Sequence, residues 1–430
     1  MKFPFFIGTM NRPADLSPFP FSEGITAATL DTETGALEPL RTETVARLES
    51  PTFLGVHPTL PVLYACSSAI PGKLSGELTV KSENATVKSG NITDTEDILT
   101  AYRIHVDGTL TLISEIASGG KNPCHICVHP SGKWLFSPNY SSGVTACVSL
   151  NVDGSFSGIQ HWKHPAEGSD HLVLPSAVTG RQECSHPHCC AVSPDGRFVM
   201  ECDLGCDRIW IWTAKKCGEN VLFDENPAEK ISAGENLNGW ELSAVQPYVD
   251  APRGSGPRHA VFSRTKNQFY VFTELACTLD IYDFEPENGR LTYRNSIPVL
   301  SDCVSGKTEG RREKQSVAGQ GAEIVRHPTE AFLYLSTRIA DRITVFREME
   351  IGVETGKFGM ETVQSISAGG EIPRFIDFDP TGRFLVSCCQ KTGRITSFYV
   401  SETDGTLRAT GFSLFSPWCA CVSFVNSGKR

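Results

Sequence analysis

The sequence predicts an all-β fold, a seven-bladed β-propeller, from three observations. Short apolar, β-branched or aromatic runs that end on a small or polar residue occur seven times along the chain. They recur every 52 to 72 residues, and five of the seven follow a Pro-containing turn. A strand-like segment without a partner in its own repeat stands at the C-terminus. Repeats of this length, built from short strands and turns, are typical of propeller blades.

Each blade is expected to contain four antiparallel strands, a to d. The runs that define the repeat are the b strands, at residues 5–9, 62–66, 134–138, 198–202, 269–273, 332–336 and 384–388. The a strands precede the turns, at residues 124–128, 189–192, 258–262, 324–326 and 374–378. Strands c and d follow b and end in a second turn, such as Asp153-Gly154 or Asn288-Gly289.

The two ends of the chain are expected to share one blade. The first run, at residues 5–9, has no a strand before it, whereas residues 419–424 form a spare strand after Pro417. This C-terminal strand would complete the N-terminal blade, and ring closure would remove the open edges that make sheets aggregate.

One domain, residues 1–430, is expected because the repeat runs from end to end without a linker. Three longer polar segments interrupt it, near residues 71–97, 226–252 and 301–321. Their Ser, Gly, Asn and charge content cannot supply a core, so we expect surface loops there.

Composition predicts a cytoplasmic protein without a membrane span. No apolar stretch approaches the roughly 20 residues that a span requires, and the first ten residues are too short for a secretory signal. Many of the 16 cysteines lie inside expected strands, where reduced cysteine packs as a small hydrophobic residue. A monomer is expected, because a closed ring of blades can stand alone.

The rim of the ring is where the sequence predicts a site. Strands a and b are antiparallel neighbours, so the start of every a strand and the end of every b strand lie at one rim. Polar side chains occupy many of these positions: Asn139, His188, Asp203, Arg258, Glu274, Arg338 and Arg374. The sequence therefore predicts a mostly cationic pocket that contains a carboxylate.

Such a pocket in a chain of formal net charge −10 favours a small anionic metabolite, because the overall field repels polyanions such as nucleic acids. Guanidinium groups bind phosphates and carboxylates through paired hydrogen bonds. Glu274 is the expected base, since a carboxylate near arginine stays ionised and can take a proton. The expected substrate-binding residues are Arg374, Asn139, Asp203 and His186. This chemistry requires no cofactor.

Other interpretations of these residues stay open. His186 and His188 could form a metal-binding pair, but no third ligand of matching spacing is evident, and no metal site is predicted. Asp203 could cap the turn after its strand, and Arg374 could form an ion pair in the channel wall. The histidines at positions 57, 125, 129 and 327 are expected to make hydrogen bonds in turns or between blades.

Several short motifs occur together and in order: residues 119–125 (GGKNPCH), 139–143 (NYSSG), 181–182 (RQ), 186–188 (HPH), 203–207 (DLGCD) and 256–259 (GPRH). Through them the sequence resembles the lactonase seven-bladed propellers, a family that includes bacterial 6-phosphogluconolactonases of propeller type and the fungal carboxymuconate lactonizing enzyme. The resemblance extends from Ile7 to Leu407. It implies a catalytic set of Glu274, His188, Arg258 and Arg338, all of which the rim geometry also selects.

The resemblance leaves the reaction open, because ring opening and ring closure of a lactone use overlapping groups. The preferred hypothesis is hydrolysis of 6-phosphogluconolactone to 6-phosphogluconate, a step of the pentose phosphate pathway. Arg258 and Arg338, with Arg374 as a further candidate, would hold the anionic group and polarise the lactone carbonyl. Glu274 would activate water, and His188 would position the ring or donate to the leaving oxygen. The alternatives are a muconate-type cycloisomerase, with Glu274 as proton donor to carbon, and a non-catalytic interaction platform. Ile339, where the family has glycine, is expected to narrow or reshape the pocket.

Overall fold

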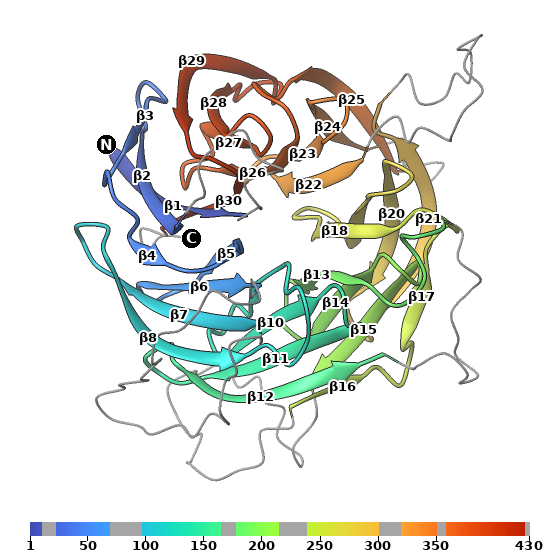
Figure 1. Ribbon diagram of the computed structural model, residues 1–430. Coiled ribbons are helices and arrows are strands. Elements are labelled where there is room, and N and C mark those ends of the chain that lie inside the picture. Colours follow the sequence, from blue (N-terminus) through green and yellow to red (C-terminus); the bar gives the residue numbers. More distant parts are fainter. Residues whose placement is uncertain are drawn as a thin grey trace.

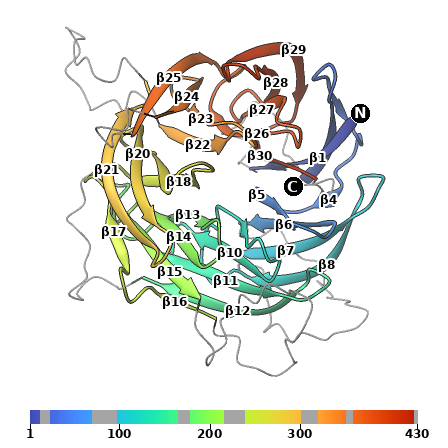
Figure 2. The same ribbon diagram turned by 180° about the vertical axis from the view of Figure 1, so that it is seen from behind.

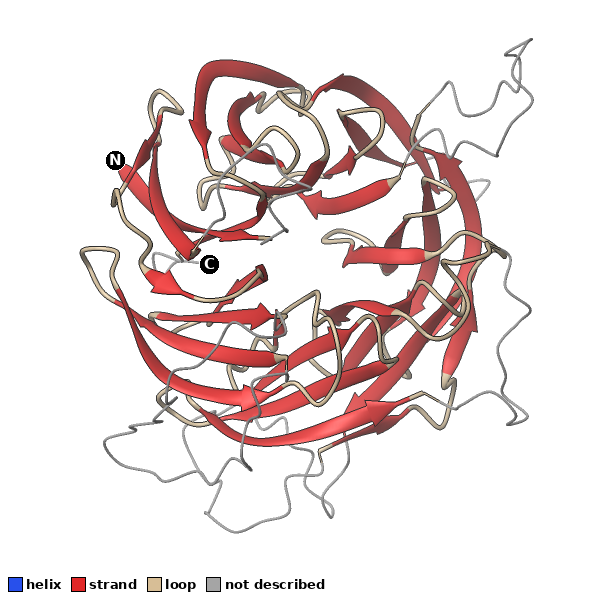
Figure 3. Cartoon of the chain, in the orientation of Figure 1, coloured by secondary structure: helices blue, strands red, loops and turns tan. Residues whose placement is uncertain are grey.

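The fold is a ring of seven antiparallel sheets around a central axis (Figure 1), and it confirms the predicted propeller. The computed structural model describes residues 1–10, 23–68, 97–164, 178–214, 239–300, 320–350 and 358–425. Every regular element in these ranges is a strand (Figure 3). No helix that could cross a membrane occurs in the described residues.

The first blade contains both ends of the chain, as predicted. Its inner strand is β30 (Cys419–Phe424), which pairs with β1 (Lys2–Thr9), and β1 pairs in turn with β2 (Gly24–Asp31). In this register Phe5 lies opposite Phe424 and Ile7 opposite Val422. The outer edge consists of β3 (Leu37–Pro39) and β4 (Ala46–Arg47), which both pair with β2. Viewed from behind, β1 and β30 again lie side by side (Figure 2), so the ring is closed by strand pairing.

The other six blades follow in chain order, each with its inner strand first. The second blade contains β5 (Pro51–Val56), β6 (Val62–Ser67), β7 (Ile98–Ile104) and β8 (Leu110–Ala117). The third contains β9 (Cys127–Val128), β10 (Trp134–Asn139), β11 (Val144–Leu150) and β12 (Phe156–Lys163). The fourth contains β13 (Pro187–Val192), β14 (Phe198–Asp203), β15 (Arg208–Ala214), β16 (Trp240–Leu242) and β17 (Tyr248–Asp250).

The last three blades have four strands each. The fifth contains β18 (Pro257–Phe262), β19 (Gln268–Thr273), β20 (Thr278–Glu285) and β21 (Arg290–Pro298). The sixth contains β22 (Gly321–Arg326), β23 (Phe332–Thr337), β24 (Arg342–Glu350) and β25 (Phe358–Ser367). The seventh contains β26 (Pro373–Phe378), β27 (Phe384–Cys389), β28 (Arg394–Val400) and β29 (Leu407–Phe415).

One predicted loop is partly wrong. The described part of segment 226–252 contains β16 and β17, which both pair with β15 and complete the fourth blade. Trp240 of β16 is buried against the rings of Phe136 and Trp134 in the third blade. The surrounding polar residues concealed this aromatic anchor in the sequence. Most of the other two predicted loops lies outside the described residues.

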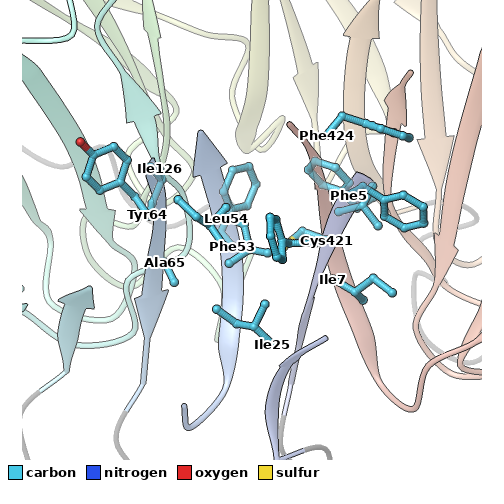
Figure 4. Packing of buried hydrophobic residues seen from close by; sticks show 14 of the residues in the cluster. Phe5, Ile7, Ile25, Phe53, Leu54, Tyr64, Ala65, Ile126, Cys421 and Phe424 are labelled. Atoms are coloured by element: carbon cyan, nitrogen blue, oxygen red, sulfur yellow. The ribbon is translucent and has the colours of Figure 1, made fainter. Parts of the chain in front are cut away.

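The core fills the interfaces between blades. A cluster shared by the first two blades contains Phe5, Phe424, Phe53 and Leu54, and it reaches Ile126 of the third blade (Figure 4). The rings of Phe5 and Phe424 lie 5.0 Å apart, so the strand pair that closes the ring is also packed at its side chains. Most of the 14 cysteines in the described residues are buried in this packing.

The His-Pro turns link neighbouring blades through three of the four histidines, as predicted. Nε2 of His57 lies 3.1 Å from the Gly132 carbonyl oxygen, and Nε2 of His327 lies 3.0 Å from that of Gly382. His129 makes the same contact to Gly196, at 2.9 Å. His125 also makes a contact between blades, because its Nε2 lies 3.6 Å from Sγ of Cys189 in the fourth blade, but it lies away from the turns, with its ring 5.2 Å from that of His259.

Candidate active site

A β-bulge at the start of the inner strand defines the site position in several blades. In β13, β18 and β26 the strand has one extra residue between its first proline and the next residue paired with the neighbouring strand. The extra residues are His188, Arg258 and Arg374. A bulge interrupts the ladder and re-aims a side chain, and bulges are frequent beside active sites. In a regular strand, successive side chains point to opposite faces of the sheet. The repeated bulge changes this alternation at equivalent positions and thus directs polar groups of several blades to one rim.

Glu274 lies at the centre of the site. It directly follows β19, and its backbone N–H donates to the Gly256 carbonyl at 2.7 Å. Its carboxylate Oε2 accepts hydrogen bonds from Nε of Arg258 at 3.0 Å and from Nη2 of Arg338 at 2.8 Å. The other oxygen, Oε1, accepts from Nη2 of Arg181. Glu274 is 3% exposed, so three guanidinium groups hold a carboxylate that is almost entirely buried.

The charge state of Glu274 follows from two opposed effects. Burial raises the pKa of its carboxyl group, whereas Arg338, Arg258 and Arg181 lower it. The arginines prevail and hold the pKa well below the ordinary range of glutamate. Glu274 is therefore an anion at any physiological pH, and while all three ion pairs persist it is a weak base.

The guanidinium groups are fixed by the backbone of the neighbouring blade. Nη1 of Arg258 donates to the carbonyl of Ala322, and Nη2 of Arg338 donates to that of Gly321 at 3.0 Å. Arg258 is 2% exposed, and only 12% of the Arg338 side chain is exposed. These bonds hold the planar groups in one orientation, which is the condition for paired binding of an anion.

Arg374 differs from the other arginines because it has no ion pair among the described residues. It is partly accessible to solvent, and burial together with the charges of Arg258 and Arg338 lowers its pKa to about 9. It remains a cation at neutral pH. The alternative of an ion pair in the channel wall is therefore not supported, and four guanidinium groups interact with one carboxylate at this rim.

His188 contributes a neutral imidazole. Burial and the charge of Arg258 lower its pKa well below the ordinary value. Its Nδ1 is buried and has no hydrogen-bond partner in the described residues. Its ring lies edge-on to that of Tyr140, with the centroids 5.6 Å apart. A neutral histidine can donate from one ring nitrogen and accept at the other.

His186 supports the site from one side. Its ring stacks on Tyr140 with the centroids 4.5 Å apart, and its Nδ1 lies 2.8 Å from the Tyr140 carbonyl oxygen. Tyr140 also interacts with Arg181, whose side chain is 33% exposed. In the described residues no group of three or more His, Cys, Asp or Glu side chains is arranged to hold a metal ion.

Two predicted substrate-binding residues, Asp203 and Asn139, are fully buried and make hydrogen bonds within the scaffold. Asp203 is fully buried, and its carboxylate accepts five hydrogen bonds, from Ser185, His186, Gly205, Cys206 and Trp210. It therefore organises the turn after β14, which is the alternative that the sequence left open. Asn139 is also fully buried, and its Nδ2 donates to the Ser118 carbonyl at 3.3 Å. Asp203 thus has little capacity left for a ligand, whereas Oδ1 of Asn139 is buried and has no hydrogen-bond partner in the described residues, so ligand binding by Asn139 stays a prediction.

The positions of strand ends do not predict Arg181 as a site residue, because it precedes β13 by several residues. The only signal was its place in the Arg-Gln motif. Ile339 is 53% exposed, so it lies at the surface of the rim, and its effect on the pocket stays a prediction.

The fold and the site define a class: seven-bladed propellers with a buried carboxylate and several arginines at one rim, suited to small anionic molecules. The chain belongs to the family Lactonase, 7-bladed beta-propeller, which it matches over residues 5–424. This confirms the predicted lactonase family.

Named relatives agree with this assignment. The chain is 25% identical to the 6-phosphogluconolactonase of Bacillus subtilis, over 94% of this chain and 95% of the relative. A putative 6-phosphogluconolactonase of Bacteroides fragilis has a similar structure, with a TM-score of 0.72, 20% identity and coverage of 99% and 98% of the two chains. A periplasmic gluconolactonase of Pseudomonas aeruginosa gives a TM-score of 0.73 at 22% identity, with 99% of both chains covered. At these identities the two solved structures establish the fold alone.

Proposed function

We propose that this protein hydrolyses a small anionic sugar lactone, 6-phosphogluconolactone, to 6-phosphogluconate. The observation that carries the proposal is the buried Glu274 carboxylate, held by Arg181, Arg258 and Arg338 near Arg374, which has no ion pair in the described residues. Family membership supports lactone chemistry, and the name of the Bacillus relative supports the phosphorylated substrate. A cytoplasmic location and a monomeric state remain predictions.

The excess of positive charge explains why the substrate should be an anion. Four cationic side chains interact with a single carboxylate, so the site is electrostatically incomplete without a further negative group. Arg374 lacks an ion pair in the described residues, and Arg181 is the most exposed of the three partners of Glu274. These two residues can bind a phosphate group without dismantling the buried pairs of Arg258 and Arg338. Each charge-assisted hydrogen bond contributes about 1.5–3 kcal/mol.

Substrate binding would also adjust the basicity of Glu274. When a phosphate draws Arg181 away from Oε1, the carboxylate loses one of the charges that lower its pKa. The pKa then rises towards the ordinary value, and Glu274 becomes a better base only when substrate is present. A positioned base of this kind contributes roughly 10²–10⁴ in rate.

The bond changes follow from this arrangement. Glu274 takes a proton from a water molecule as the water oxygen attacks the lactone carbonyl carbon. Negative charge develops on the carbonyl oxygen, where a guanidinium group stabilises it. The tetrahedral intermediate then breaks its bond to the ring oxygen, which takes the proton back from Glu274. The new carboxylic acid ionises, so each turnover releases one proton. Neutral His188 is placed to orient the water or the ring oxygen.

The same charges disfavour the cycloisomerase alternative. That reaction needs Glu274 as a protonated acid that donates to carbon, whereas Arg338 and Arg258 hold it ionised. A non-catalytic platform is disfavoured as well, because several kcal/mol are needed to bury each of these charges. A role in catalysis or binding accounts for this costly burial of Glu274 and its arginines.

Acid release from freshly generated 6-phosphogluconolactone tests the proposal. The wild type should accelerate release above the spontaneous rate, and Glu274→Gln should lose at least about 10² of this acceleration. Glu38→Gln removes an exposed carboxylate that pairs with Lys2 on the outer edge of the first blade and serves as the control. A wild type that does not exceed the spontaneous rate would refute the proposed substrate.

A further inference from the structure

A second cavity opens at the opposite rim of the ring. It has a volume of about 550 Å³ and is lined by three neighbouring inner strands and the turns after two of them, at residues 189–194, 259–264, 323–324 and 326. Glu274 and the arginines that bind it are not among the lining residues. The cavity is therefore distinct from the candidate active site, although both lie on the same inner strands.

Titratable side chains connect the two regions. His125, His259 and Glu323 line the cavity, and Nδ1 of His259 lies 2.7 Å from Oε1 of Glu323. The His259 ring is also 5.1 Å from the ring of His188, which belongs to the site of Glu274. His259 directly follows Arg258 in β18, so consecutive residues serve the two regions. The series Glu274, His188, His259 and Glu323 thus leads from one rim to the cavity at the other.

Buried polar atoms along this series have no hydrogen-bond partner in the described residues. They are Nδ1 of His125, Nδ1 of His188, Nε2 of His259 and Oε2 of Glu323. Desolvating such an atom costs about 1–3 kcal/mol unless it is satisfied, and ordered water commonly supplies the partner. Four such atoms around adjacent rings favour a hydrated path rather than a dry core.

We propose that His259 and Glu323 conduct the proton released by lactone hydrolysis from the Glu274 site to the cavity at the opposite rim. This inference rests on the proposed function, because only ring opening supplies the proton. The binding and ring-opening steps do not use the His259–Glu323 pair, whereas proton transfer gives this pair a role. A product anion bound among the arginines would occupy the nearer rim, so the path through the ring is the free exit.

The surroundings of Glu323 suit it to this task. Burial raises its pKa to about 8, with Asp377 of β26 contributing, whereas Arg258 of β18 and Arg374 of β26 oppose the rise. His259 contacts Oε1 directly, and burial together with Arg258 lowers the pKa of this histidine well below the ordinary value. Glu323 can therefore gain and lose a proton near neutral pH, which is the most effective range for an acid–base group.

Each step of the transfer conserves atoms and charge. The product acid gives its proton to water beside neutral His188, and this water passes a proton to Nε2 of His259. His259 releases the proton on Nδ1 to Oε1 of Glu323, and Glu323 releases one to water in the cavity. After the transfer His259 holds its proton on Nε2, and the path is reset when its side chain reorients and again presents an N–H to Glu323. No oxidant, reductant or further reactant is involved.

Glu323→Gln tests the path, because it retains the shape of the side chain and removes its acid–base function. In weakly buffered solution we expect kcat to fall about tenfold, below the range for a primary acid–base catalyst, while KM for the lactone is unchanged. Imidazole, which is small enough for the cavity, should restore kcat of the variant and leave the wild type unaffected. Glu330→Gln removes an exposed carboxylate near the same rim and is the matched control.

The outcomes separate the two proposals. Acceleration by the wild type with an unchanged Glu323→Gln rate in weak buffer would overturn the proton path and leave the lactonase intact. A lowered kcat that imidazole does not restore would also overturn it, because a structural defect is not repaired by a proton carrier. No acceleration by the wild type would refute both proposals. If thermal unfolding shows that Glu323→Gln is misfolded, His259→Gln is tested by the same criteria.

Discussion

Replacement of Arg338 by methionine should make the activity sensitive to acid. Methionine keeps much of the apolar stem of the side chain and removes the guanidinium group that lies 2.8 Å from Oε2 of Glu274. Arg338 is the strongest of the charges that lower the pKa of Glu274. For charge centres about 4 Å apart, an effective dielectric constant of about 20 gives an interaction of roughly 4 kcal/mol. This loss is large enough to return the pKa of Glu274 towards that of an ordinary glutamate.

The sign of the effect follows from the direction of the shift. A depressed pKa keeps Glu274 ionised down to low pH, so the wild type should retain kcat/KM throughout a mildly acidic range. In Arg338→Met the raised pKa allows protonation within that range, and kcat/KM should fall as the pH decreases. The profile of kcat/KM is the appropriate measurement because it reports groups of the free enzyme. Spontaneous hydrolysis is subtracted at each pH.

A control separates this effect from a general loss of positive charge. Arg294→Met removes an exposed arginine that pairs with Asp283 on the outer strands of the fifth blade. It should leave the acid limb unchanged. If Arg338→Met retains measurable activity and its acid limb coincides with that of the wild type, Glu274 is not the group whose ionisation controls catalysis.

Two further predictions concern the scaffold. Burial lowers the pKa of His164, but the adjacent Glu201 carboxylate outweighs this effect and raises the pKa to about 9. The ion pair therefore contributes about 3 kcal/mol to the free energy of unfolding. This contribution is fully present below the pKa of histidine in the unfolded chain, about 6.5, and is lost as the pH rises through about 9. Denaturant unfolding across this range should show the decline, and an equally sloped curve for His164→Gln would contradict it. Gly205→Ala should destabilise the fold by about 1–3 kcal/mol and lower the activity, because its Cβ would lie 1.8 Å from the Cys184 carbonyl in the segment that carries Arg181. An unfolding midpoint of Gly205→Ala equal to that of the wild type would contradict the steric argument.

The ring and its closure could be predicted from sequence because both depend on periodic burial. Each b strand is an apolar run, and the unpaired strand at residues 419–424 has only one place in a closed ring. The fourth blade was harder to predict. Its outer edge consists of β16 and β17, two short strands within a polar segment, and a single buried side chain, Trp240, anchors β16. An alternation of apolar and polar residues cannot be detected over three residues. Strands as short as β16 and β17 can therefore be recognised only in the folded structure, where they pair with β15.

The core of the candidate site could also be predicted, because antiparallel pairing alone brings the ends of b strands and the starts of a strands together. Glu274, Arg258 and Arg338 meet for this reason. The same rule selected Asp203, which occupies an equivalent position, but its carboxylate already accepts from donors of its own turn and of the segment before β13. Position in the repeat identifies which side chains can reach a rim. It does not identify which of them retain free hydrogen-bonding capacity there.

Arg181 shows the opposite limit. It contacts Glu274 from a segment that precedes the inner strand of the fourth blade, so no rule based on strand ends could place it. Yet it is the partner best suited to respond to a ligand, because Arg258 and Arg338 are fixed to the carbonyls of Ala322 and Gly321, whereas a third of the Arg181 side chain is exposed. The propeller repeat supplies the rigid ion pairs, and a segment outside the repeat supplies the adjustable one. Substrate-dependent activation of Glu274 would then depend on a residue that the periodicity of the fold does not specify.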